Sequence, residues 1–201
     1  MTQKLKTNDL LAILIIAAMV AGCREISVPR PKGYFRIDLP AKRYLSFSDS
    51  LSRTMNMPLK FEYPDYGTVS NLSEGTTEPG WLNIDFPAFR ATIYLTYKNV
   101  NKNLEALIEQ TYRMNVKNHI AKADAINEQV IQDPARNIYG ILYDLKGNTA
   151  TAVQFFVTDS TDHYLRGSLY FKAEPNPDSL APVVEFFRDD IIHLIETLSW
   201  K

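Results

Sequence analysis

The chain has 201 residues, of which 45% are hydrophobic and 11% aromatic, enough apolar material for a single domain with a buried core. Its formal net charge of -1 is too balanced for the basic surface that nucleic-acid binding requires, so we expect no nucleic-acid partner. The single cysteine excludes a disulfide within the chain, and packing must therefore supply the stability.

Residues 1–22 have the pattern of a secretory signal peptide. Lys4 and Lys6 supply positive charge, residues 10–20 form an almost wholly apolar run, and small side chains follow this run. The run is shorter than the roughly 20 apolar residues that a transmembrane helix needs. We therefore predict a cleaved signal rather than a membrane span.

Cys23 follows the small residues directly, as in the lipobox of bacterial lipoproteins. We predict cleavage between Gly22 and Cys23, attachment of diacylglycerol to the Cys23 thiol, and acylation of the new amino terminus by a chain such as palmitate. Each buried CH2 contributes about 0.8 kcal/mol, so two or three such chains hold a protein on a membrane where one does not. Residues 23–33 are rich in proline and predict a short extended linker, which leaves residues 34–201 for the domain.

Alternation of apolar and polar residues predicts most of the strands. Two short strands are expected at residues 34–39 and 59–63, each ended by a proline, and a hairpin is expected over residues 81–97. The turn Lys146-Gly147-Asn148 supplies the positive φ that a tight hairpin needs. The second group of strands is expected at residues 125–131, 138–145, 149–157 and 164–171.

A period of 3.6 residues predicts two helices. The first begins after Asn103, which can cap it, and runs to about residue 117. The second follows the loop at residues 175–179 and pairs an apolar stripe with a charged face, which we expect to be solvated. His193 lies one turn after Asp189 and Asp190 on that helix, so a surface metal site is conceivable. A solvated polar face is the simpler interpretation, and we predict no metal ligands.

This order of elements predicts an α+β fold with a single antiparallel β-sheet flanked by helices, rather than a wound parallel sheet. The topology resembles the Mog1/PsbP-type α/β/α sandwich. A resemblance of topology does not indicate an activity.

The known catalytic and nucleotide-binding motifs are missing from the sequence. It has no Gly-x-Ser-x-Gly elbow, no His-Glu-x-x-His pair, no Walker loop and no glycine-rich dinucleotide turn. Its three histidines, His119, His163 and His193, are scattered, and the sequence indicates no partner for His163. We therefore predict no catalytic residues and no cofactor.

Polar residues near the predicted strand ends are the candidates for a partner-binding surface. Aromatic residues beside prolines, at residues 61–66 and 81–89, favour either a rigid exposed contact surface or packing over the sheet edge. His119 and Lys122 follow a helix, where cationic residues also have a structural explanation in the helix dipole. The candidate residues are Asp85, Arg90, His119, Lys122 and Asp124.

Several motifs, taken in order, resemble the gliding motility lipoprotein GldD family of the Bacteroidota. The resemblance extends over nearly the whole chain after Cys23. The motifs are PKGYFRIDLP at residues 31–40, FEYP at 61–64, WLNIDFP at 81–87, ATIYLTY at 91–97, His119 with Lys122-Ala123-Asp124, and the block at residues 154–171.

The resemblance implies a lipid-anchored protein of the cell envelope that acts in gliding motility and type IX protein secretion. It implies a non-catalytic accessory or assembly factor, with envelope proteins of that machinery as partners and no catalytic residues to carry over. Residues 24–27 lack the acidic run that looks like a surface-export signal in this phylum, so we expect the domain to face the periplasm. A periplasmic hydrolase and a small-ligand-binding lipoprotein are the alternatives. The hydrolase requires catalytic side chains that meet in a pocket, and the ligand carrier requires an apolar cavity.

Overall fold

The computed structural model of the protein describes residues 37–70, 80–172 and 177–201. The predicted signal peptide, the cleavage and lipidation site at Gly22 and Cys23, and the linker at residues 23–33 lie outside the described residues. The strand predicted at residues 34–39 lies partly outside them, and its described part forms no strand.

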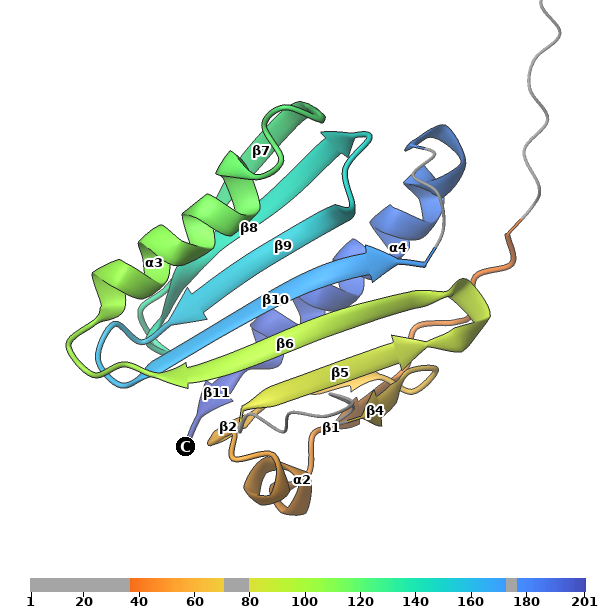
Figure 1. Ribbon diagram of the computed structural model, residues 1–201. Coiled ribbons are helices and arrows are strands. Elements are labelled where there is room, and N and C mark those ends of the chain that lie inside the picture. Colours follow the sequence, from red (N-terminus) through yellow and green to blue (C-terminus); the bar gives the residue numbers. More distant parts are fainter. Residues whose placement is uncertain (1–36, 71–79, 173–176) are drawn as a thin grey trace, which may run out of the picture. The chain divides into compact units, whose positions relative to one another are not determined.

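Seven antiparallel strands form the main sheet and follow the order β4-β5-β6-β10-β9-β8-β7 in space (Figure 1). Because β10 lies between β6 and β9, the chain leaves the sheet after β6 and returns at the far edge as β7. The bounds are β4 Thr68–Ser70, β5 Trp81–Phe86, β6 Ala91–Asn99, β7 Ala123–Asp133, β8 Ile138–Gly147, β9 Thr151–Thr158 and β10 His163–Phe171.

Helix α4 (Pro177–Thr197) covers one face of this sheet. Its apolar stripe repeats at helical spacing, and Phe187, Ile191 and Leu194 on this stripe are buried in the main core. The strands supply the other half of that core through their alternate side chains. This packing fixes which strand residues face inward and which face outward.

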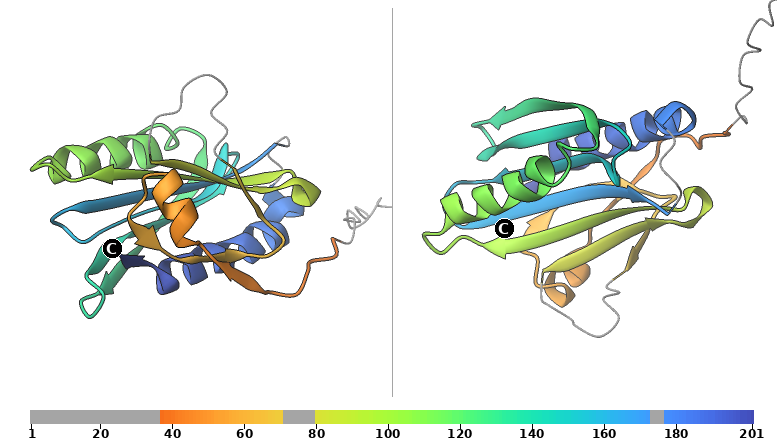
Figure 2. Two further views of the ribbon diagram at one scale, coloured as in Figure 1. Left: turned by 90° about the horizontal axis from the view of Figure 1, so that it is seen from below. Right: turned by 45° about the horizontal axis from the view of Figure 1, so that its top comes forward.

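Helix α3 (Leu104–Tyr112) lies on the opposite side of the sheet from α4, as Figure 2 shows. It continues into a π-helical turn, η2 (Arg113–Lys117), and together they cover a smaller cluster that includes Phe156 and Tyr164. This cover extends over only part of the face. The strands at the β5 edge have no helix above them (Figure 1).

The prediction of a single sheet flanked by helices is wrong, because two further two-stranded sheets accompany the main one. Strands also hold more of the described residues than helices do, so the fold is mostly β. Strands of two or three residues are too short to show alternation, and β2 pairs with β11 at the other end of the sequence. The remaining elements are β1 Tyr44–Ser46, which pairs with β3 Glu62–Pro64, β2 Leu59–Lys60, β11 Ser199–Trp200, α2 Asp49–Thr54 and the 3-10 turn η1 Pro87–Phe89.

The structure also corrects the prediction of a solvated charged face on the last helix. Asp190 lies on α4 and is only 1% exposed. Its carboxylate accepts hydrogen bonds from the Lys42 ammonium at 2.7 Å, the Tyr66 hydroxyl at 2.6 Å and the Tyr44 hydroxyl at 3.0 Å. Lys42 also donates to the Phe186 carbonyl. A buried charge is tolerated only when it is paired in this way.

Two neighbouring contacts reinforce this attachment. The rings of Tyr44 and His193 stack with their centroids 3.6 Å apart, and His193 Nε2 lies 2.8 Å from a carboxylate oxygen of Glu62. Burial first, and then the Asp190 carboxylate, raise the pKa of both Tyr44 and Tyr66 above the ordinary value, so both remain hydroxyl donors at neutral pH. The side chains of α4 thus hold the first described segment of the chain.

Asp190→Asn is expected to lower the free energy of unfolding by about 3 kcal/mol. The substitution keeps the side-chain shape but leaves the Lys42 ammonium without its counter-charge. Asp189→Asn is the matched control, because Asp189 is the exposed neighbour on the same helix and should change stability by less than about 0.5 kcal/mol. Urea unfolding of both variants measures the difference. Equal losses would contradict the assignment of Asp190 as the buried attachment point.

Candidate functional site

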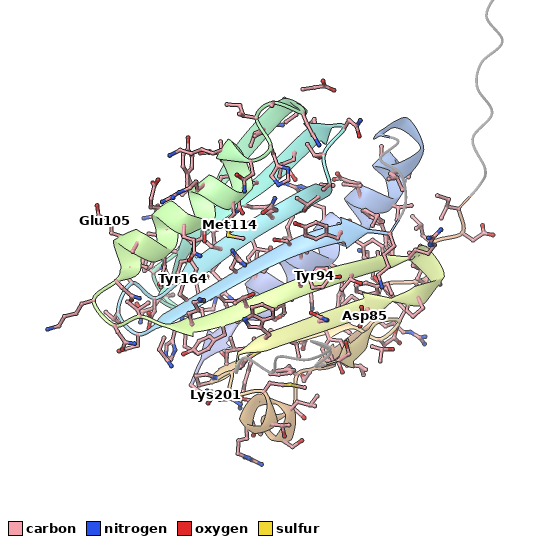
Figure 3. The ribbon with its side chains drawn as sticks, in the orientation of Figure 1. Asp85, Tyr94, Glu105, Met114, Tyr164 and Lys201 are labelled. Carbon is pink, nitrogen blue, oxygen red and sulfur yellow. The ribbon has the colours of Figure 1, made fainter. Side chains whose placement is uncertain are left out.

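One face of the sheet carries α3, and the part of this face that α3 leaves uncovered is the most distinctive surface of the domain. Tyr94 on β6 and Asp85 on β5 lie on this surface with no helix above them, whereas Tyr164 on β10 lies under α3 (Figure 3). We call the part formed by the outward side chains of β5, β6 and the end of β10 the open face. Alternation produces it, because Leu82 and Ile84 point into the core and leave their neighbours on the other side.

Three large aromatic residues stand on the open face. Trp81 is 41% exposed, Tyr94 is 40% exposed and Tyr170 is 36% exposed. The rings of Tyr94 and Tyr170 meet edge to face across neighbouring strands, with centroids 5.5 Å apart. Tryptophan and tyrosine are the residues most enriched at the energetic centres of protein interfaces. The open face therefore has the composition of a contact surface.

Asp85, a residue that the sequence singled out, lies on this face in a fixed orientation. One carboxylate oxygen accepts from the Ser70 hydroxyl at 2.6 Å and the other accepts from the Thr92 hydroxyl at 2.8 Å. Both donors are neutral, and Asp85 makes no ion pair within the described ranges. The open face thus presents a negative charge, the Asp85 carboxylate, in an orientation that two hydrogen bonds fix, beside its aromatic rings.

A groove runs along the border between the open face and α3. Its volume is about 250 Å³, and Trp81, Lys98, Gln110, Met114 and Arg166 are among its lining residues. The Arg166 guanidinium contacts the Met114 sulfur. Methionine and arginine are also enriched at interfaces, so the groove extends the contact surface toward the helix.

Arg90 lies at the end of the open face, in the turn between β5 and β6. It closes the 3-10 turn with a left-handed backbone at φ 50°. Its side chain is exposed, and its carbonyl accepts from the backbone of Lys172. Arg90 thus lies in the turn that follows β5, the strand that carries Asp85, and a surface shared by the two residues stays a prediction.

His119, Lys122 and Asp124 lie elsewhere, around the start of β7. Five strand spacings separate β7 from β5, which is about 24 Å at the usual distance between strands. Asp124 lies against Gly147, where a Cβ would come within 2.8 Å of the Asp124 carboxylate. Burial and the nearby Lys122 lower the pKa of His119, which keeps its imidazole neutral at pH 7. The structure does not bring the five predicted residues together.

Sequence reasoning missed two polar arrangements for the same reason. His163 does have partners, because its Nδ1 lies 2.7 Å from the Tyr97 hydroxyl and its ring stacks on Trp200. Asp190 likewise finds Lys42 at the other end of the sequence. No local spacing relates either pair, so nothing in the one-dimensional pattern could have indicated them.

Within residues 37–70, 80–172 and 177–201, no helix is long and apolar enough to cross a membrane. Over the same ranges, no group of three or more histidine, cysteine, aspartate or glutamate residues could hold a metal ion.

The fold and the open face define a mostly β domain in which one sheet face is partly uncovered and carries exposed aromatic residues. The chain belongs to the gliding motility lipoprotein GldD family, whose model matches residues 24–200. It is therefore a gliding-motility-related lipoprotein, anchored to a membrane of the cell envelope. The family resemblance seen in the sequence is confirmed.

Neither the curated proteins nor the solved structures add a function to this family assignment. A search of the curated proteins finds no match. Among solved structures, the chain is similar to the solution structure of cyanobacterial PsbP (CyanoP) from Synechocystis sp. PCC 6803, at 11% sequence identity and a TM-score of 0.48. The alignment covers 85% of this chain and 99% of that chain.

Lys122→Ala is expected to raise the pKa of His119 toward the ordinary histidine value. The variant removes a nearby positive charge, while burial continues to hold the pKa low. An NMR titration of the histidine ring protons measures the change, and the signals of His163 and His193 serve as internal references. An unchanged His119 titration, or equal shifts at all three histidines, would contradict the local charge effect.

Proposed function

We propose that this lipoprotein is a non-catalytic accessory or assembly factor for gliding motility and type IX protein secretion. Lipid on Cys23 anchors it, its domain faces the periplasm, and the open face binds an envelope protein of that machinery. The family supports the motility role, and the open face is the single observation that carries the binding role.

The chemistry of the open face specifies the kind of partner. Trp81, Tyr94 and Tyr170 offer flat rings that gain most from contact with apolar side chains. Asp85 adds a carboxylate whose hydrogen-bond donors among the described residues are two neutral hydroxyls. The partner should therefore bring an apolar patch that carries a lysine or arginine, because such a charge would both pair with Asp85 and set the register of binding.

The spacing of the polar residues supports a role without catalysis. A hydrolase needs a base within hydrogen-bond reach of a nucleophile, and usually a third group that orients the base. Asp85 lies on β5, whereas His119 lies in the turn before β7, a strand that five spacings, or about 24 Å, separate from β5. Asp85 and His119 thus do not converge on one site, and the binding role needs no such convergence.

A double variant, Trp81→Ala with Tyr94→Ala, is expected to fold normally and to lose its envelope partner. Each truncation of an aromatic anchor typically costs about 2 kcal/mol of binding free energy, so the pair should reduce co-purification about a hundredfold or more. The matched control is Tyr112→Ala, a tyrosine of similar exposure at 38% that does not line the groove. Affinity purification from cells after mild cross-linking measures the yield.

The control should retain the partner at the yield of the unchanged protein, and circular dichroism should show unchanged folding in all variants. Equal yields from the double variant and the wild type would contradict the open face as the binding surface.

Deletion of the gene is expected to reduce secreted type IX cargo, and the wild-type gene should restore it. A Cys23→Ala copy should leave the membrane fraction, because it lacks the acyl chains that hold it there. Cargo in the medium and the fractionation of the protein are the two measurements. Normal secretion without the gene would contradict the secretion role, and a Cys23→Ala protein that stays in membranes would contradict the anchor.

A further inference from the structure

A second hollow lies on the α4 side of the sheet, opposite the open face. It is a cleft of about 340 Å³, lined by residues of the first half of α4 and of the adjoining ends of β8 and β9. Figure 1 shows where these elements lie in the fold. Ligand sites typically begin at roughly this volume. The proposed function uses none of its lining residues.

Small and half-buried apolar side chains produce the cleft. Phe171, Leu180 and Val184 line it, and the chain has only alanine at positions 150, 152 and 181, where larger side chains would fill the space. The ladder between β9 and β10 slips at Ala152, where the pairing passes from Val153 to Thr151.

Four charged residues line the same cleft, and two of them satisfy each other. The Arg188 guanidinium binds the Asp144 carboxylate through two nitrogens, at 2.8 and 3.1 Å, and also reaches Gln129. This paired unit ties α4 to β8 and β7. A bidentate pair of this kind is already neutralised and leaves little charge for a ligand.

The other two charged residues face solvent with opposite signs. Lys146 belongs to β8 on the sheet side and Glu185 belongs to α4 on the helix side of the cleft. Both are exposed, and neither makes an ion pair within the described residues. An apolar hollow with one cation on one side and one anion on the other is complementary to a molecule that carries an apolar chain and a zwitterionic head.

We propose that this cleft binds a zwitterionic amphiphile of the phosphoethanolamine class. The acyl chain would lie against Phe171, Leu180 and Val184, the phosphate would pair with Lys146, and the ammonium would pair with Glu185. The lipid anchor of the family holds the domain beside a membrane, which is the source of such molecules. The cleft shares no lining residue with the groove beside the open face, so an amphiphile there would not depend on a partner bound to that face.

The test uses the full lipidated chain, purified from membranes and transferred into an amphipathic polymer. Native mass spectrometry then measures the binding of three probes with the same acyl chain: lysophosphatidylethanolamine, the anionic lysophosphatidylglycerol and the uncharged monoacylglycerol. The zwitterionic probe is expected to bind about fivefold more tightly than either of the others, as one exposed charge pair allows. Equal binding of the three probes would overturn the assignment of the head group.

Charge exchange tests the same pairs directly. Lys146→Glu and Glu185→Lys should each remove the preference for the zwitterionic probe, and the double variant should restore it because both opposite charges are again present. Glu105→Lys, an exposed change on α3, is the control and should have no effect. Ala181→Trp should fill the hollow and abolish binding of all three probes. Binding that survives Ala181→Trp would place the amphiphile elsewhere and overturn the proposal.

Discussion

The domain depends on one buried carboxylate. Asp190 receives hydrogen bonds from Lys42, Tyr44 and Tyr66, and so joins the centre of α4 to chain segments from the other end of the sequence. A carboxylate with no exposed surface needs all of these donors, since each missing one would leave an uncompensated polar group in the interior. The segment that carries β1 is therefore fixed on α4, and the two small sheets build around it.

This attachment determines which surfaces remain for function. Helix α4 covers one side of the main sheet, and the segment that carries β1 covers one flank of α4. The open face and the cleft beside Val184 are among the surfaces that this arrangement leaves free. They lie on opposite faces of the sheet. A protein partner on the open face and an amphiphile in the cleft would thus not compete, and the sheet between them would keep both sites in a fixed relation.

The sequence was informative wherever structure follows from local pattern. Alternation located β5, β6, β8, β9 and β10, and the turn glycine Gly147 has the positive φ, 99°, that the hairpin demands. Prediction from the sequence failed where the structure depends on contacts between residues that are far apart in the chain. The pairing of β2 with β11, the burial of Asp190, and the distance between Asp85 and His119 all depend on topology, and the α+β assignment was wrong because the small sheets have no periodic signal. The sequence predicts the open face only in part. Alternation indicates which side chains share that face, but it does not indicate that no helix covers them.

The central claim is that the open face binds an envelope protein, and site-specific photo-cross-linking in living cells tests it most directly. A photoreactive amino acid at position 94 should yield one discrete adduct of higher mass after irradiation, because Tyr94 stands at the middle of the face (Figure 3). The same amino acid at position 112, of matched exposure on α3, should yield none. No adduct at position 94, or the same adduct at both positions, would contradict the account.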